Sequence, residues 1–309
     1  MDVVPYEFCL ASCTAAYHAV KEISNLDCIG NLWTTAVLFC QTHIKQIKVQ
    51  IQFSENATEY TYAIFEVHND DTRVRRIRYD HFLKMDPKYL QITQVQLTDE
   101  LCPHVIQRNK VFDDLLPFLC KAAVATTELV VNYGTKATSD LPIDDLQALT
   151  SNCKIPNFVL YKNNNLMEAY LKSLFESDQN ISLTLKTGTK NWSQNGFNYV
   201  RDQFLAFKIK KWDFLELNQN TFGCHFYVDL RFAVQFVELS KKMKAAEKLE
   251  ICGWKNFDLN DLVRYLNGWT VDGPKGPTFK SYVSKKNGCE LVISWRPYSK
   301  NVFTFTLNK

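Results

Sequence analysis

The sequence predicts an α/β fold in which short strands alternate with amphipathic helices in an irregular, leucine-rich-repeat-like solenoid. Pairs of apolar residues spaced two apart recur along the middle of the chain at intervals of roughly 25 to 35 residues. Most pairs are followed by a turn-forming residue and then by a helical stripe. An antiparallel hairpin pattern closes the chain. A closed doubly wound sheet is the structural alternative, because alternation of strand and helix fits it too.

Length and composition favour a large globular core. The 309 residues are 46% hydrophobic and 13% aromatic, with only 10 glycines and 9 prolines, so extended disorder is not expected. The net charge of +3 is small for a protein that neutralises many phosphates, so no nucleic acid partner is expected. No run reaches the roughly 18 apolar residues of a membrane span, so no membrane association is expected either.

The cysteines indicate a reducing compartment. All 10 are scattered without a Cys-x-x-Cys pair, and Asp2, Pro5 and Glu7 interrupt any secretory apolar core at the start. A cytoplasmic or nuclear location is therefore expected. Cys9 and Cys13 lie four apart on a predicted helix. Two small buried side chains are the preferred interpretation of this pair, with a metal ligand pair or a disulfide as the alternative.

Changes in periodicity divide the chain into four segments. Residues 1–43 have helical spacing with a break near residues 25–31, which predicts a helical segment. Residues 44–88 alternate apolar and polar positions between turn signals, which is typical of a three-stranded β-meander. Residues 89–270 form the α/β repeat region, and residues 271–309 a C-terminal antiparallel β cap.

The last strand of the meander carries an arginine cluster, Arg73, Arg75, Arg76 and Arg78. Such a cluster can grip phosphate or an acidic peptide. Aspartates lie close to it in sequence, so a solvated edge strand guarded by charge is the preferred interpretation.

The repeat region is defined by apolar doublets that alternate with helical stripes. The doublets are Val95 and Leu97, Leu129 and Val131, Phe158 and Leu160, Leu183 and Leu185, Leu215 and Leu217, and Leu249 and Ile251. The last doublet passes directly into a helical stripe over residues 259–266 that Asp258 can cap and Gly268 can terminate. This alternation of strands and helices requires parallel strands joined by helical crossovers.

Three short strands, residues 279–284, 289–295 and 302–307, form the predicted cap. Asn287 and Gly288 are the preferred pair for a tight hairpin turn between the first two strands.

No catalytic, phosphate-binding or paired-cysteine metal motif occurs in the sequence, so neither a cofactor nor a metal is predicted. The nearest metal-like fragments, Cys102-Pro103-His104 and Cys224-His225, each lack a second pair at useful spacing. The aromatic residues Trp192, Phe197, Tyr199 and Phe204 could stack on bases, but their helical spacing favours a place in the core.

Several short motifs resemble a large nematode family of F-box-like and F-box-associated proteins that are mostly uncharacterised. These motifs are the opening Met-Asp-x-Val-Pro-Tyr-x-Phe-Cys, the Leu32-Trp33 pair, the tyrosine-rich strand at residues 60–65, and Cys-x-Leu-x-Ile-x-Trp at residues 289–295. The resemblance implies that the N-terminal helices dock on the Skp adaptor of a cullin ubiquitin ligase while the repeat region holds a target. It also implies that residues 1–43 form an F-box-like helical segment and that Pro5, Phe8, Leu32 and Trp33 lie in the docking helices.

The predicted function is therefore that of a non-enzymatic protein-binding module. Its strand face would present the following residues to a protein target: Tyr161, Thr184, Lys186, Glu216, Asn218 and Glu250. Two alternatives stay open. One is an α/β enzyme with its site at the carboxyl ends of the strands, around Asn163, Gly188 and Asn220. The other is a scaffold that has lost adaptor binding.

Overall fold

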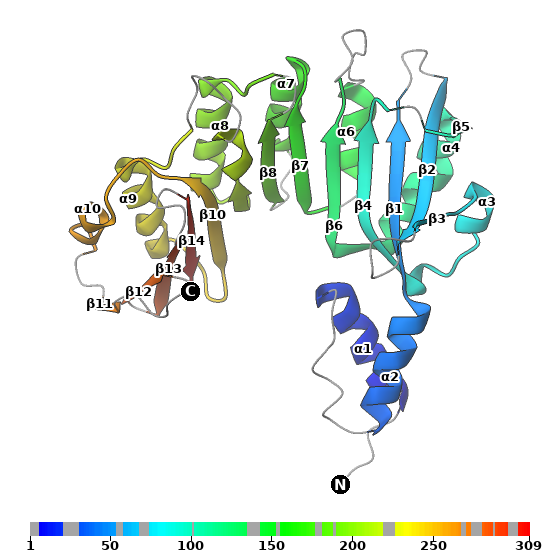
Figure 1. Cartoon of the computed structure of the whole chain (residues 1–309), viewed down its shortest axis with the longest axis horizontal. Helices are drawn as coiled ribbons and strands as arrows, with labels where there is room; N and C mark the ends of the chain where they lie inside the picture. The colour runs from blue at the N-terminus through cyan, green and yellow to red at the C-terminus, as the bar shows by residue number, and fades with distance from the viewer. Residues whose placement is uncertain are drawn as a thin grey trace. The chain divides into compact units, whose positions relative to one another are not determined.

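The fold is mixed α/β, as the sequence predicts. A computed structural model describes residues 6–20, 31–53, 58–67, 74–100, 102–134, 143–152, 155–176, 181–187, 190–218, 226–266, 270–272, 280–286, 288–295 and 302–309. The chain divides into two compact units, residues 1–158 and 159–309, and each is built on an open β-sheet with helices (Figure 1). No closed sheet forms among the described strands.

Unit 1 starts with a helical hairpin and continues into a mixed sheet. The hairpin is α1 (Tyr6–Val20) and α2 (Asn31–His43). The strands are β1 (Lys45–Gln52), β2 (Glu59–Val67), β3 (Val74–Arg76), β4 (Leu90–Thr98), β5 (His104–Gln107) and β6 (Ala123–Asn132). Their order is β6-β4-β1-β2, and both β3 and β5 pair with the outer side of β2. β1, β4 and β6 are parallel, whereas β2 is antiparallel to β1.

The remaining helices of unit 1 are short. They are α3 (Tyr79–Phe82), η2 (Pro87–Tyr89), α4 (Arg108–Lys110), η3 (Val111–Leu115), α5 (Leu116–Ala122) and α6 (Ile143–Asn152). Figure 1 shows α4 and α6 behind the sheet, while α1 and α2 lie together at the end where β1 begins.

Two of the predicted doublets are direct neighbours in this sheet. Val95 lies opposite Leu129 and Leu97 opposite Val131 on the parallel strands β4 and β6, and all four side chains are buried. The side chains between the buried positions of β1 are only half-buried, which is typical of a strand with one covered face.

The predicted β-meander exists as three antiparallel strands, β1, β2 and β3. β1 also pairs with β4, so these strands belong to the larger sheet of unit 1. All three residues of β3 are exposed, and β3 is the last strand on its side of the sheet among the described strands.

Unit 2 begins within β7 (Asn157–Lys162). Its further elements are α7 (Leu166–Leu174), β8 (Ile181–Thr187), α8 (Gln194–Leu205), β9 (Ile209–Asp213), η4 (Leu215–Asn218), α9 (Leu230–Glu238), η5 (Leu239–Lys241), β10 (Lys248–Trp254), α10 (Leu259–Val263), β11 (Thr270–Asp272), β12 (Lys280–Lys286), β13 (Cys289–Trp295) and β14 (Val302–Asn308). The strand order is β7-β8-β9-β10-β14-β13-β12-β11. β8, β9 and β10 are parallel, and the strands from β14 to β11 are antiparallel.

Short polar side chains start three helices of this unit. The side chain of Ser193 accepts a hydrogen bond from the backbone of α8, that of Asp229 from α9, and that of Asp258 from α10. Each satisfies a backbone N–H that has no carbonyl partner in the first helical turn. The cap predicted at Asp258 is thus present. Gly268, the predicted terminator, lies outside the described residues.

A continuous apolar row forms the core of unit 2. Leu183, Trp212 and Ile251 lie opposite one another on β8, β9 and β10, and the row continues through Phe305 and Ile293. All five side chains are buried. Helices α8 and α9 pack aromatic rings on the indole of Trp212, including Phe197 at a centroid distance of 4.9 Å and Phe232 at 6.1 Å. Trp192, Phe197 and Phe204 are buried, as predicted, and Tyr199 is half-buried.

One predicted strand is wrong. Leu215 and Leu217 lie in the 3₁₀ helix η4, and the strand of this repeat is β9, which contributes Trp212 to the core. The amide of Phe214 donates to the carbonyl of Cys252 at 3.0 Å, and the amide of Leu215 then donates to the carboxylate of Asp213 at 3.0 Å. The second bond turns the chain out of the sheet before the leucines are reached.

The C-terminal strands agree closely with prediction. β12, β13 and β14 form an antiparallel sheet, and β14 pairs with β10. Gly288 has a φ of +77°, the left-handed conformation that a tight hairpin turn requires, while Asn287 lies outside the described residues. None of the helices within the described ranges combines the length and the apolar character that crossing a membrane requires.

Candidate partner-binding surfaces

The sheet of unit 2 has one polar, partly exposed face, which we call the open face. It carries two rows of side chains that lie opposite one another across neighbouring strands. One row is Ser182, Lys211, Glu250 and Thr306, and the other is Thr184, Asp213, Cys252 and Thr304. None of these side chains is fully buried, whereas the alternate positions on β8, β10 and β14 are buried. The open face is therefore a surface of hydrogen-bonding groups, and the apolar core lies on the opposite side of these strands.

Three of the predicted partner-binding residues lie together at one end of the open face. Tyr161 is half-buried on β7, and Thr184 and Lys186 share a face of β8. The ammonium of Lys186 lies 5.5 Å from the centre of the Tyr161 ring, within the range of a cation–π contact. This arrangement offers an aromatic surface and a positive charge side by side, and tyrosine is one of the residues enriched in protein-binding hot spots.

Glu250 also lies on the open face, but ion pairs engage its carboxylate. The ammonium groups of Lys211 and Lys248 each lie 3.0 Å from one of its oxygens. Burial alone would raise the pKa of Glu250, yet the two lysines outweigh it and lower this pKa below its ordinary value. The carboxylate of Glu250 is consequently ionised at neutral pH, and it pairs with both Lys211 and Lys248.

Glu216 and Asn218 are separated from the strand residues, because both lie in η4 after the end of β9. The expectation that they continue the strand face is wrong. The turn at Asp213 removes them from the sheet before they could extend the two polar rows. Trp254, the last residue of β10, lies at this end of the open face instead of Glu216 and Asn218. It follows Cys252 at the alternating position on β10, and its indole N–H donates to the carbonyl of Leu215 at 3.0 Å.

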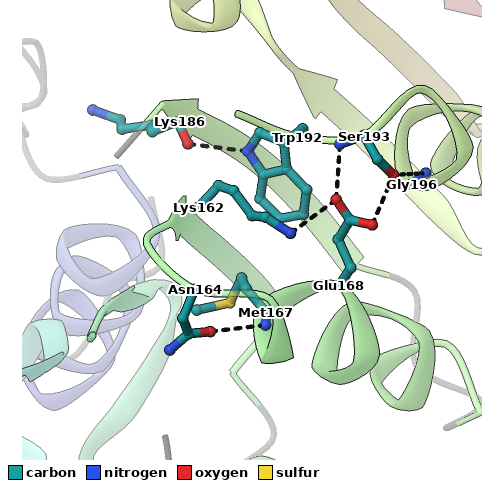
Figure 2. A network of polar contacts seen from close by, with 8 residues as sticks. All are labelled: Lys162, Asn164, Met167, Glu168, Lys186, Trp192, Ser193 and Gly196. Atoms are coloured by element: carbon teal, nitrogen blue, oxygen red, sulfur yellow. Dashed lines mark hydrogen bonds and ion pairs between the residues drawn. The ribbon is translucent and has the colours of Figure 1, made fainter. Parts of the chain in front are cut away.

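A network of polar contacts lies at the carboxyl ends of β7 and β8 (Figure 2). The ammonium of Lys162 contacts the carboxylate of Glu168 at 2.9 Å, and both side chains are largely buried. Ser193, which caps α8, donates to the same carboxylate through its backbone N–H and its hydroxyl, each at 2.8 Å. Its hydroxyl also accepts from the N–H of Gly196 at 2.9 Å. The network thereby connects β7, α7 and the start of α8.

Trp192 and Lys186 link this network to the open face. The indole N–H of Trp192 donates to the backbone carbonyl of Lys186 at 3.0 Å, and the ammonium of Lys162 lies 5.6 Å from the Trp192 ring centre. Figure 2 shows Trp192 between the Lys162–Glu168 pair and the strand that carries Lys186. The same contacts therefore hold the end of β8 in place.

The network contains a serine, a carboxylate and a lysine, groups that also occur in catalytic sites. The lowered pKa of Glu168 favours a structural role instead. Burial alone would raise the pKa of Glu168, while the hydrogen bonds from Lys162 and Ser193 lower it below its ordinary value. A carboxylate held in its ionised form is a weak general base at neutral pH. Of the residues considered for an enzymatic site here, Asn163 is buried at the end of β7, and Gly188 and Asn220 lie outside the described residues.

Three of the four predicted adaptor-docking residues, Phe8, Leu32 and Trp33, lie on the hairpin of α1 and α2. The rings of Phe8 and Trp33 meet edge to face at a centroid distance of 6.3 Å. Phe8 is 58% exposed and Leu32 is 42% exposed, although both are large apolar side chains. Trp33 packs partly against the hairpin core. Pro5 lies outside the described residues. The hairpin thus presents an apolar surface to solvent.

The hairpin core contains three free thiols, Cys9, Cys13 and Cys40, all of them buried. Burial, followed by the neighbouring thiols Cys40 and Cys9, raises the pKa of Cys13 above its ordinary value. The preferred interpretation of Cys9 and Cys13 as small buried side chains agrees with this position. Cys102 is also buried and His104 is exposed, while Cys224 and His225 lie outside the described residues. Within the described ranges no three potential metal ligands gather at one point.

Unit 1 contains a polar trio that no sequence pattern predicted, in which Tyr60 and Asp145 are buried and Arg108 is partly exposed. The hydroxyl of Tyr60 donates to the carboxylate of Asp145, and the guanidinium of Arg108 binds the same carboxylate, with Nε–O distances of 3.2 and 3.3 Å. Burial, reinforced by Asp145, raises the pKa of Tyr60 above its ordinary value. The three residues lie far apart in sequence. The only local signal was the acidic pair at the start of α6, which is also consistent with simple helix capping.

No protein-family model, no curated protein and no solved structure matches this chain. The interpretation of both surfaces therefore rests on the chain's own residues.

Proposed function

We propose that this protein is a non-enzymatic protein-binding module whose open face holds a protein target. The observation that carries the proposal is the two-row arrangement of Ser182, Thr184, Lys211 and Asp213 with their partners on β10 and β14. Polar side chains on a rigid sheet are positioned before a partner arrives, so less conformational entropy is lost on binding. The Tyr161 and Lys186 pair would supply the anchor at one end.

The leucine-rich-repeat-like interpretation is part of this proposal. It is supported by the parallel strands β8, β9 and β10, which neighbour one another in chain order. In repeat proteins of this kind, consecutive strands form a binding surface and the helices lie on the other side. The irregular length of the units would make the surface specific to one target.

The proposal extends to the α1 and α2 hairpin as a docking surface for a Skp-type adaptor of a cullin ubiquitin ligase. Its support is the exposure of Phe8 and Leu32 beside Trp33. Exposed large apolar side chains that touch one another are typical of sites that a partner covers. A target-recognition subunit of a ubiquitin ligase would need both surfaces, one for the adaptor and one for the target. A scaffold that has lost adaptor binding would need only the open face.

Affinity purification followed by mass spectrometry tests both surfaces separately. The variant Tyr161→Ala/Lys186→Ala should lose captured target proteins about tenfold, because both anchors are truncated. The variant Phe8→Ala/Leu32→Ala should lose adaptor and cullin peptides but keep the targets. Leu38→Ala is the matched control for the second variant, since Leu38 is 54% exposed on the same helix six positions after Leu32.

Equal recovery of targets by the wild type and the Tyr161→Ala/Lys186→Ala variant would refute the open-face proposal. Equal loss of adaptor in Leu38→Ala and in Phe8→Ala/Leu32→Ala would refute the specific docking surface. Absence of adaptor and cullin peptides from the wild-type sample, with targets still captured, would identify the scaffold alternative. Thermal melting of each variant excludes unfolding as the cause of a loss.

A further inference from the structure

The outer side of β2 carries a long composite edge made of two short strands. β5 pairs with residues 59–62 of β2, and β3 pairs with residues 65–67. The amide of Ile77, just after β3, donates to the carbonyl of Ile64 at 2.9 Å. We call residues 74–77 and 104–107 the composite edge. Together they line nearly all nine residues of β2, and no other described strand pairs with their far side.

The backbone of the composite edge directs unpaired groups away from the sheet. In antiparallel pairs, residues alternate between those that hydrogen-bond to the neighbouring strand and those that face outward. The bond from Ile77 to Ile64 and the bond from Arg108 to Thr58, both 2.9 Å, fix this alternation. The residues whose backbone N–H and C=O face outward are therefore Val74, Arg76 and Val105, whereas the C=O of Gln107 accepts the first bond of α4.

The side chains of the composite edge combine apolar and positive groups. Val74 is 55% exposed and Val105 is 63% exposed, which is high for large aliphatic side chains. Arg75, Arg76 and the adjoining Arg78 are exposed, and within the described residues none of them forms an ion pair. Charged side chains on an edge strand oppose its pairing with other chains, but this role does not require exposed valines beside them.

We propose that the composite edge binds, by strand addition, an extended segment of another protein that carries acidic and aliphatic side chains on one face. Val74, Arg76 and Val105 share one face of the edge, because all three lie opposite odd-numbered residues of β2. The outward N–H and C=O groups would pair with the segment's backbone, Val74 and Val105 would contact its aliphatic side chains, and Arg76 would contact its carboxylates. This surface is distinct from the open face of unit 2 and from the α1 and α2 hairpin. The inference goes beyond the proposed function and does not depend on it.

Fluorescence anisotropy with synthetic nine-residue peptides tests the inference on the full-length protein. The probe carries glutamate and valine in turn at every second position with serine between them, and the comparison peptide has lysine in place of glutamate. At about 0.05 M salt, where charge interactions are weakly screened, the acidic peptide should bind at least about tenfold more tightly. Two further acidic peptides carry N-methyl groups on the odd or on the even residues. Their charge is unchanged. In one of them the methyl groups replace the backbone N–H hydrogens that would bond to the composite edge, and this peptide should bind about tenfold more weakly.

Two single charge reversals in unit 1 show where the peptide binds. Arg76→Glu should weaken the acidic peptide about tenfold, since its backbone and side chain both lie on the composite edge. Lys121→Glu makes the same charge change at an exposed position of α5 and should change the affinity less than about twofold. Melting temperatures of both variants should match the wild type, because both side chains are exposed.

Three outcomes would overturn the inference. Equal weakening by Arg76→Glu and Lys121→Glu would mean attraction to overall charge rather than to this edge. Full binding by both N-methylated peptides would mean that no strand is added. Dimerisation of the wild-type protein in sedimentation experiments, abolished by Arg76→Glu, would mean that the edge pairs with a second copy of the chain.

Discussion

Removing the ammonium of Lys162 is expected to destabilise unit 2 strongly. The side chain of Lys162 is 5% exposed and that of Glu168 is 21% exposed, so water can replace little of their attraction. Breaking a buried ion pair by deleting one partner costs about 3 to 5 kcal/mol, because the other charge stays buried. Glu168 keeps two hydrogen bonds from Ser193, which places Lys162→Met near the lower end, at about 3 kcal/mol.

Urea unfolding measured by tryptophan fluorescence is the appropriate assay. Five of the six tryptophans follow residue 158, so the signal reports mainly on unit 2. Lys241→Met is the control, because the Lys241–Glu238 pair is exposed at both ends and should contribute less than about 1 kcal/mol. The double variant Lys162→Met/Glu168→Gln removes both charges and should recover part of the loss. A free energy of unfolding for Lys162→Met that equals that of Lys241→Met would refute the reasoning.

The pH dependence gives a second measurement of the same pair. The pKa of Glu168 is lower in the folded protein than the ordinary value of 4.5, so its contribution to stability is full above about pH 4.5. This contribution is lost as the pH falls through the folded pKa. The free-energy difference between wild type and Glu168→Gln should therefore be constant near neutral pH and shrink below pH 4.5. A difference that stays constant down to pH 3, well below 4.5, would contradict the assignment.

Two further changes test the packing of unit 2 and the polar trio of unit 1. Gly253→Ala should cost about 3 kcal/mol, because a Cβ there would lie 2.2 Å from the buried ring of Phe214. Gly288→Ala, whose Cβ would meet open space at a φ of +77°, should cost only about 1 kcal/mol in the same urea assay, and equal losses would contradict the clash. Because the pKa of Tyr60 is raised, wild-type stability should fall as the pH rises above about 10, the ordinary value for tyrosine. Calorimetry should show a smaller fall for Tyr60→Phe, and an equal fall would contradict the assignment.

Local patterns in the sequence were sufficient for most of the strands and helices. The alternation of apolar and polar residues predicted β1 and β2, and the doublet of Val95 and Leu97 predicted β4. The turn signals near the C-terminus predicted β12 to β14 nearly to the residue. Asp258 was found as a cap because capping depends on residues within one helical turn. The placement of Tyr161, Thr184 and Lys186 on one face likewise follows from period two within short strands.

Contacts between distant residues were decided only by the tertiary structure. Leu215 and Leu217 have the spacing of a strand, but the bonds at Phe214 and Asp213 end the strand earlier, and Trp212 fills the core instead. No local pattern distinguishes these possibilities, since the choice depends on which side chain fits the row between Leu183 and Ile251. The sequence thus determined the periodicity and the turns of this protein, because these depend on near neighbours. Only the fold determined which charges pair and which edge stays open, because both depend on residues brought together from afar.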